Sequence, residues 1–166
     1  MITLATAACL IVIFALLIAL AWTDHKLYIL PNRYNLALLI AFAAFHILTG
    51  WTYVSITGAT LGLLAGGGFL LAIRAVANQI MKMDTIGLGD VKFMMAAGFG
   101  LGIPDVFMIL SVGAFLGMLH GGLLYLVQKH EDNPQASLAH VNVPAGVGLC
   151  IATAGMVVFR FYGWWI

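Results

Sequence analysis

Two aspartates each stand where a polar stretch of the chain meets an apolar one. Asp24 follows the apolar run that opens the sequence, and Asp90 follows Gly87-Leu88-Gly89 and precedes a further apolar run. Two carboxylates held close together cannot both ionise cheaply, so they share a proton. The ionised carboxylate can activate a water for attack on a peptide carbonyl, and the protonated one can donate to the carbonyl oxygen. We therefore predict Asp24 and Asp90 to be a catalytic pair whose individual roles stay open.

The other side-chain types capable of chemistry are sparse. Cys9 and Cys150 lie inside apolar runs, far apart, and no C-x-x-C spacing occurs, so neither a zinc site nor a redox pair is indicated. His46 and His120 also lie in apolar runs, and we predict that they are hydrogen-bonded helix-packing groups rather than ligands or bases. His25 does not face its neighbour Asp24 on a helix. We predict no metal and no cofactor.

The composition indicates whether water or membrane lipid surrounds the chain that carries this pair. The chain has 166 residues, of which 63% are hydrophobic and 8% charged, whereas soluble domains carry roughly 25% charged residues. A soluble fold of this size could not bury so much apolar surface, so membrane lipid must surround most of the chain. The net charge of +1 provides no basic surface for nucleic acid.

Six apolar segments divide the chain, too long and too uniform for strands. We expect an all-α, polytopic membrane protein with about six transmembrane helices in a single domain, residues 1–166. About 20 apolar residues cross a bilayer, so the second and fourth segments are short. The segments are Ile2–Trp22, Tyr34–Thr49, Val54–Ala77, Val91–Ile103, Val106–Val127 and Val143–Ile166.

The basic residues indicate an orientation. They gather in alternate connections between the segments, and only Arg160 departs from this pattern. By the positive-inside rule, both termini then face outward, and Asp24 and Asp90 lie at the cytoplasmic face. The residues on the cytoplasmic side are Lys26, Arg33, Arg74, Lys82, Lys92 and Lys129.

Glycines recur every four residues in two of the segments. Such spacing lets helix backbones approach closely in a membrane, so we predict two tight helix–helix contacts that could bring the aspartates together. The two series are Gly58, Gly62 and Gly66, and Gly113, Gly117 and Gly121.

Three short motifs around these positions resemble those of the type IV prepilin peptidases. Asp24 is followed seven residues later by Pro31-Asn32, Gly87-Leu88-Gly89-Asp90-Val91-Lys92 is similar to the family's G-x-G-D-x-K, and Pro144-Ala145-Gly146 is similar to its Pro-aromatic-Gly signature. They occur in the family's order and together span most of the chain. The resemblance implies an aspartyl endopeptidase of the bacterial inner membrane that removes short basic leader peptides from prepilin-like precursors on the cytoplasmic side.

The departures from the family pattern narrow this expectation. Asp84 stands where many members have a glutamate, and Ala145 replaces the usual aromatic residue. The four-cysteine loop that larger members use for N-methylation is not found in this sequence. The chain therefore resembles the short, peptidase-only branch that serves tight-adherence (Flp) pili. The sequence does not indicate an oligomeric state.

The secondary motif residues keep more than one interpretation. Lys92 is either a positive-inside charge at a helix start or a group that tunes Asp90 and contacts substrate. Asp84 is either an interfacial anchor or a contact for a basic leader. Pro31 and Asn32 are expected to shape the turn into the second helix. Gly87 and Gly89 are expected to leave a bare backbone against which an extended substrate can lie.

Two other functions remain open at this point. One is a different G-x-G-D intramembrane protease, such as a preflagellin peptidase. The other is a small proton-coupled carrier that uses Asp24 and Asp90 as a relay. Repeated halves with broken helices, which favour a carrier, are not visible in the hydropathy pattern.

The positive-inside argument generates a topology prediction. A reporter inserted at Gln135 should report a cytoplasmic location, and reporters at either terminus should report an external one, because six of the seven basic residues lie on the Gln135 side. Alkaline phosphatase and fluorescent-protein fusions in cells provide the measurement. A cytoplasmic N-terminus would reverse the predicted orientation.

Overall fold

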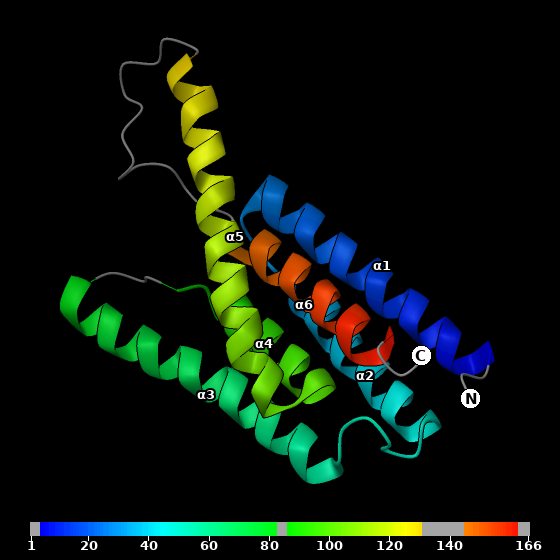
Figure 1. Ribbon diagram of the computed structural model, residues 1–166. Coiled ribbons are helices and arrows are strands. Elements are labelled where there is room, and N and C mark those ends of the chain that lie inside the picture. Colours follow the sequence, from blue (N-terminus) through cyan, green and yellow to red (C-terminus); the bar gives the residue numbers. More distant parts are fainter. Residues whose placement is uncertain (1–3, 83–85, 131–144, 163–166) are drawn as a thin grey trace.

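The computed structural model describes residues 4–82, 86–130 and 145–162, and these ranges form six helices and no strand. Each helix coincides broadly with one of the predicted apolar segments, which confirms the all-helical class. Figure 1 shows the helices as one bundle in which α5 extends well beyond its neighbours. The helices are α1 (Leu4–Leu27), α2 (Asn32–Leu48), α3 (Ile56–Met81), α4 (Leu88–Leu101), α5 (Ile103–His130) and α6 (Ala145–Tyr162).

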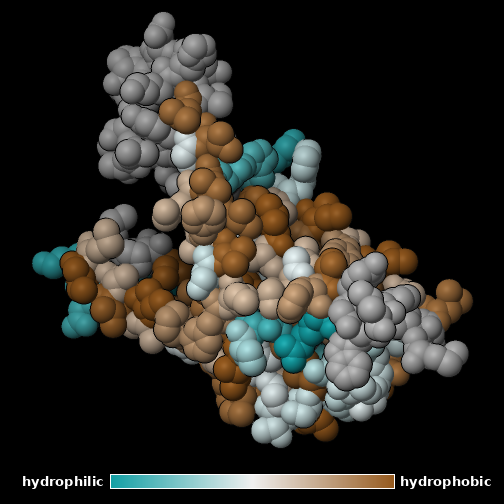
Figure 2. All heavy atoms as spheres, viewed as in Figure 1, coloured by the Kyte–Doolittle hydropathy of each residue, from teal (hydrophilic) through white to brown (hydrophobic). Residues whose placement is uncertain are grey.

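Three of the described helices are long and apolar enough to cross a membrane, namely α1, α3 and the Ile103–Leu123 part of α5. Helix α2 and the Ala145–Phe161 part of α6 are apolar but shorter. Helix α4 has 14 residues and is therefore about 21 Å long, as short as predicted. The sixth segment was expected to be a full span, and its last four residues lie outside the described range. Hydrophobic residues cover most of the described surface on the face that Figure 2 shows.

Glycines join α3 to α4. A β-carbon on Gly66 would collide with the Met94 carbonyl, and one on Gly62 would collide with the Gly98 carbonyl. The helix backbones therefore approach as closely as the glycine spacing predicted. Gly58, the third member of that series, mainly faces Val54 and Ser55 at the start of its own helix.

A second pair of helices, α5 and α6, packs in the same manner. A β-carbon on Gly113 would lie 3.0 Å from the Leu149 Cα, and one on Gly148 would lie 2.7 Å from the Gly117 nitrogen. Helix α5 follows α4 after the single residue Gly102, whose φ of 85° suits glycine. The bundle thus consists of two close helix pairs, α3–α4 and α5–α6, with α1 packing on α6 and α2, and α2 on α4.

The ends of the bundle differ in their charged residues. The loop from α1 to α2 and the starts of α4 and α6 lie at one end. Asp24, in the last turn of α1, and Asp90, in the first turn of α4, belong to this end. The start of α1 and the end of α6 lie at the other end (Figure 1). There Arg160, the exception to the charge pattern, donates to Asp105 over 2.6 Å and to the Tyr53 carbonyl over 3.5 Å.

The glycine contacts can be tested by adding one methyl group at a time. Gly66→Ala should lower the free energy of unfolding by about 1–3 kcal/mol, because α4 must move away from the added carbon. Gly68→Ala, where the added carbon meets nothing within 4 Å, should be neutral or stabilising, because alanine is the better helix former. Thermal unfolding in detergent measures both, and equal effects would contradict the close α3–α4 contact.

Candidate active site

Asp24 lies in the last turn of α1 and points at the start of α6. Its side chain is buried, with 5% of the residue exposed, and its Oδ2 accepts a hydrogen bond of 3.0 Å from the Val147 backbone nitrogen. The amino-terminal turn of a helix favours a negative charge through its free N–H groups and its dipole. Gly146 makes this contact possible, because a β-carbon there would lie 2.8 Å from the Asp24 Cγ and Oδ2.

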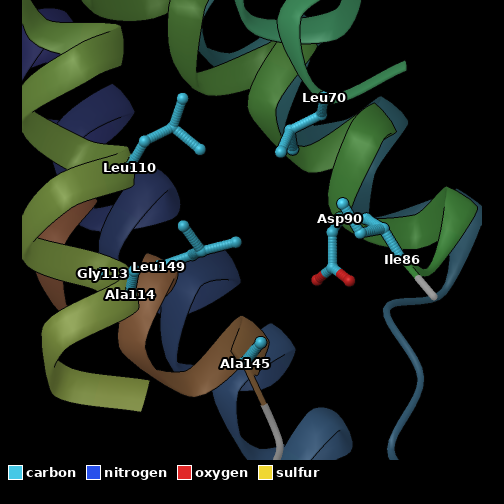
Figure 3. Close-up of a pocket in the computed structure, with 8 residues that line it drawn as sticks. All are labelled: Leu70, Ile86, Asp90, Leu110, Gly113, Ala114, Ala145 and Leu149. Carbon is cyan, nitrogen blue, oxygen red and sulfur yellow. The ribbon is translucent and has the colours of Figure 1, made fainter. Parts of the chain in front are cut away.

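Asp90 lies in the first turn of α4, three residues after the N-cap Gly87. Its carboxylate accepts a hydrogen bond from the Gly87 backbone and lies within electrostatic range of Asp24. Buried Cys150 of α6 lies within range of both aspartates. Figure 3 shows Asp90 at one side of a pocket, with Ala145 and Leu149 of α6 on the other side. The fold therefore places the two predicted residues at one end of the bundle, near each other.

The loop between α1 and α2 fills the space between the two helix starts. A β-carbon on Gly89 would lie 3.0 Å from the Leu30 carbonyl oxygen, and one on Gly146 would lie 3.0 Å from the Leu30 Cδ1. Leu30 is thus held between the starts of α4 and α6. It lies next to Gly89, which precedes Asp90, and next to Gly146, which faces Asp24. Pro31 is the N-cap of α2, and Asn32 is its first residue, as expected of residues that shape this turn.

Side chains of α2 bind the start of α4 and connect the first motif to the second. The Lys92 ammonium donates to the Asn32 Oδ1 over 2.8 Å, and the Asn35 amide donates to the Gly89 carbonyl over 3.1 Å. Lys92 therefore has a structural partner in the first motif, which neither sequence interpretation anticipated. Asn35 was missed, although a polar residue inside an apolar membrane segment is itself a signal.

A pair of histidines next to Asp24 was also missed. The His25 Nδ1 lies 3.3 Å from the His120 Nε2, and both residues lie within electrostatic range of Asp24. His120 is therefore a hydrogen-bonded group between helices, as predicted, and α5 approaches the end of α1 at this point. Among the described residues, no cluster of three or more histidine, cysteine or acidic side chains could hold a metal ion.

The glycines of the second motif also make contacts within the chain that were not predicted. Gly89 is half-buried, faces the chain's own Leu30 and accepts a hydrogen bond from Asn35, whereas Gly87 is exposed, so a bare backbone for an extended substrate stays a prediction. Gly87 starts α4 and leaves room for the Asp90 carboxylate. Asp84 and Pro144, two further predicted site residues, lie outside the described residues.

Comparison with known proteins identifies the family of this chain. The model of the type IV leader peptidase family matches residues 11–122, a range that contains both aspartates and both of the first two motifs. The chain belongs to the type IV leader peptidase family. No solved structure shows a significant match.

Curated relatives of this family carry the name prepilin leader peptidase/N-methyltransferase. The protein of Aeromonas hydrophila is 32% identical over 140 residues, which cover 82% of this chain and 44% of that protein. The protein of Neisseria gonorrhoeae is 27% identical over 156 residues, 94% of this chain and 52% of its own length. The protein of Bacillus subtilis is 29% identical over 122 residues, which cover 72% of this chain and 45% of that protein. The chain spans about half the length of these relatives.

The contact between Gly146 and Asp24 yields a prediction for this chain. Gly146→Ala should displace the Asp24 carboxylate and weaken its bond to Val147, and the cleavage rate should fall by about 10- to 100-fold, because small misplacements of reacting groups are costly. Gly155→Ala, in the same helix with nothing within 4 Å of the added carbon, should leave the rate unchanged. Cleavage of a prepilin by purified protein provides the measurement. Full activity of Gly146→Ala would contradict this contact.

Proposed function

We propose that this chain is an aspartyl endopeptidase that removes the leader peptide from type IV prepilin-like precursors at the cytoplasmic face of the bacterial inner membrane. Asp24 and Asp90 are its catalytic residues. The observation that carries the proposal is their placement at the same end of the bundle, on helices α1 and α4, within electrostatic range of each other. Family membership supports the class of substrate, because the curated relatives are named for prepilin leaders.

The pair suits hydrolysis without a covalent intermediate. With one proton between them, the ionised aspartate takes a proton from water as the oxygen of that water attacks the peptide carbonyl. The protonated aspartate donates to the carbonyl oxygen. When the tetrahedral intermediate collapses, the C–N bond breaks and the leaving amine receives a proton from the pair.

The surroundings of the two residues differ, and this difference supports a proposal for their separate roles. Asp24 accepts backbone hydrogen bonds from Val147 and Gly146 at the start of α6, and His25 and His120 are close by. Asp90 accepts one backbone hydrogen bond and borders an apolar cavity. Donors and nearby imidazoles favour the ionised form, and apolar surroundings favour the neutral form. Asp24 is therefore the base that activates water, and Asp90 is the acid.

We assign the chain to the peptidase-only branch that serves tight-adherence (Flp) pili. Cys9 and Cys150 are the two cysteines of the sequence, so this chain by itself cannot build a four-cysteine site. A purified sample should cleave a prepilin and leave the new amino terminus unmethylated in the presence of S-adenosylmethionine. Mass spectrometry of the product distinguishes the two forms, and a methylated product would contradict the assignment.

Substitution of each aspartate tests the proposed function directly. Asp24→Asn and Asp90→Asn should each lower the rate of prepilin cleavage by at least about 100-fold, the lower end of what general acid–base catalysis contributes. Asp24→Asn should have the larger effect, because an asparagine at position 90 can still donate a hydrogen bond to the carbonyl oxygen. The losses should not add in the double variant, since the residues act as a unit.

The control for this experiment is Asp105→Asn, which changes a carboxylate at the opposite end of the bundle. It should lower thermal stability through the loss of the Arg160 ion pair and leave the cleavage rate per folded molecule near that of the unmodified chain. Substantial turnover by either active-site variant would refute the catalytic assignment. A larger loss in Asp90→Asn than in Asp24→Asn would reverse the assigned roles.

A further inference from the structure

A second groove lies where α2, α3 and α4 meet, and it is separate from the pocket beside Asp90. It has a volume of about 180 Å³ and is open on one side. None of the described residues that line it also lines the Asp90 pocket. Its lining has a polar part and an apolar part. The polar residues are Asn32, Asn35 and Lys92, and the apolar ones include Leu39, Leu63 and Met95.

The polar residues gather at the end of the groove where α2 and α4 begin. Asn32 is the first residue of α2, and Lys92 lies in the second turn of α4. The Lys92 ammonium donates to the Asn32 Oδ1 over 2.8 Å, and Lys92 is the one ionisable residue among the described residues that line the groove. Exposed Arg33 follows Asn32. This end therefore carries positive charge, and a lysine at such a place suits a phosphate group.

Asn35 lies at the same end and has an unsatisfied hydrogen-bonding atom. The residue is 4% exposed, and its amide nitrogen donates to the Gly89 carbonyl over 3.1 Å. Its Oδ1 has no hydrogen-bond partner within the ranges that the structure describes. A buried acceptor without a donor costs free energy. A molecule that brings a donor to this end of the groove is therefore favoured over one that has acceptors alone.

The rest of the groove is apolar and narrow. Leu36 and Leu39 follow Asn32 on one face of α2, and Leu39 is about 10 Å from Asn32 along the helix. The volume of about 180 Å³ corresponds to roughly six groups of the size of a water molecule, at about 30 Å³ each. This space holds a stretch of one acyl chain and is too small for a helix.

The groove opens on a flank of the bundle that lipid must cover. Leu36 is exposed, and so are Ile40 and Leu64, which follow the lining residues Leu39 and Leu63. Helix α3 is long and apolar enough to cross a membrane. Acyl chains therefore contact this flank, and basic pockets between membrane helices are places where the headgroups of anionic lipids bind.

We propose that this groove binds one anionic phospholipid whose headgroup carries a hydrogen-bond donor, with phosphatidylglycerol as the ligand. The lipid phosphate binds Lys92, and a headgroup hydroxyl donates to Asn35. The first part of one acyl chain lies along Leu36, Leu39 and Met95. The bound lipid joins the starts of α2 and α4. The inference goes beyond the proposed function, because binding is measured without turnover.

Thermal unfolding of the purified chain in detergent tests the choice of ligand. Dioleoyl phosphatidylglycerol should raise the unfolding midpoint by about 3 °C or more. Dioleoyl phosphatidylcholine has the same acyl chains and no net charge, and it should give less than half of that shift. Dioleoyl phosphatidylmethanol has the charge but no donor in its headgroup, and its shift should also be smaller. Glycerol 3-phosphate has no acyl chain and should give no shift.

Matched variants locate the binding to this groove. Lys92→Gln should reduce the shift caused by phosphatidylglycerol by at least half. Lys26→Gln changes an exposed lysine in the last turn of α1, outside the groove lining, and should keep the full shift. Leu39→Trp, which fills the apolar part, should reduce the shift, whereas Ile40→Trp at the exposed next position should keep it.

Native mass spectrometry provides a second measurement that does not depend on the stability of each variant. From an equal mixture of phosphatidylglycerol and phosphatidylcholine, the unmodified chain and Lys26→Gln should each retain one phosphatidylglycerol, and Lys92→Gln should lose it. Equal retention of both lipids by the unmodified chain, or equal loss in the two lysine variants, would overturn the assignment. A shift by glycerol 3-phosphate as large as that by phosphatidylglycerol would also overturn it, and an equal shift by phosphatidylmethanol would remove Asn35 from the site.

Discussion

The arrangement of this protein depends on how closely helix backbones can approach where glycine replaces a side chain. Gly62 and Gly66 bring α3 against α4, and Gly113 and Gly148 bring α5 against α6. At the charged end, Gly89 and Gly146 hold Leu30 between the starts of α4 and α6. Lipid gives no hydrophobic drive between helices, so close packing and hydrogen bonds must hold the bundle together. The positions of Asp24 and Asp90 follow from these few contacts.

Much of the fold could be predicted because the membrane imposes a simple rule on the sequence. Apolar runs mark helices, and the segment predicted at Val54–Ala77 corresponds to helix α3, Ile56–Met81. The ends of helices were less predictable. The first helix was expected to end at Trp22 and continues to Leu27, because polar residues such as Thr23 and Asp24 remain helical when other helices pack against them. The hydropathy of a residue does not show whether another helix packs against it.

The site was predictable to a different degree at each residue. Asp24 and Asp90 carried a signal in their types and in the motifs around them, and the fold brings them near each other. The packing of Gly89 against Leu30 was not readable, because nothing in the sequence around a glycine shows which part of the chain will pack against it. The pairing of His25 with His120 depends on how α5 lies against α1, and this register has no local signature.

The ion pair between Arg160 and Asp105 bears on how the chain is assembled. Arg160 is near the end of α6, and Asp105 is in the first turn of α5. Placing an unpaired guanidinium inside a bilayer costs much free energy. An ion pair, whose net charge is zero, costs less. Arg160 in α6 therefore pairs with a carboxylate that is synthesised some fifty residues earlier. In this protein, the order of synthesis matches the order in which the charges can be neutralised.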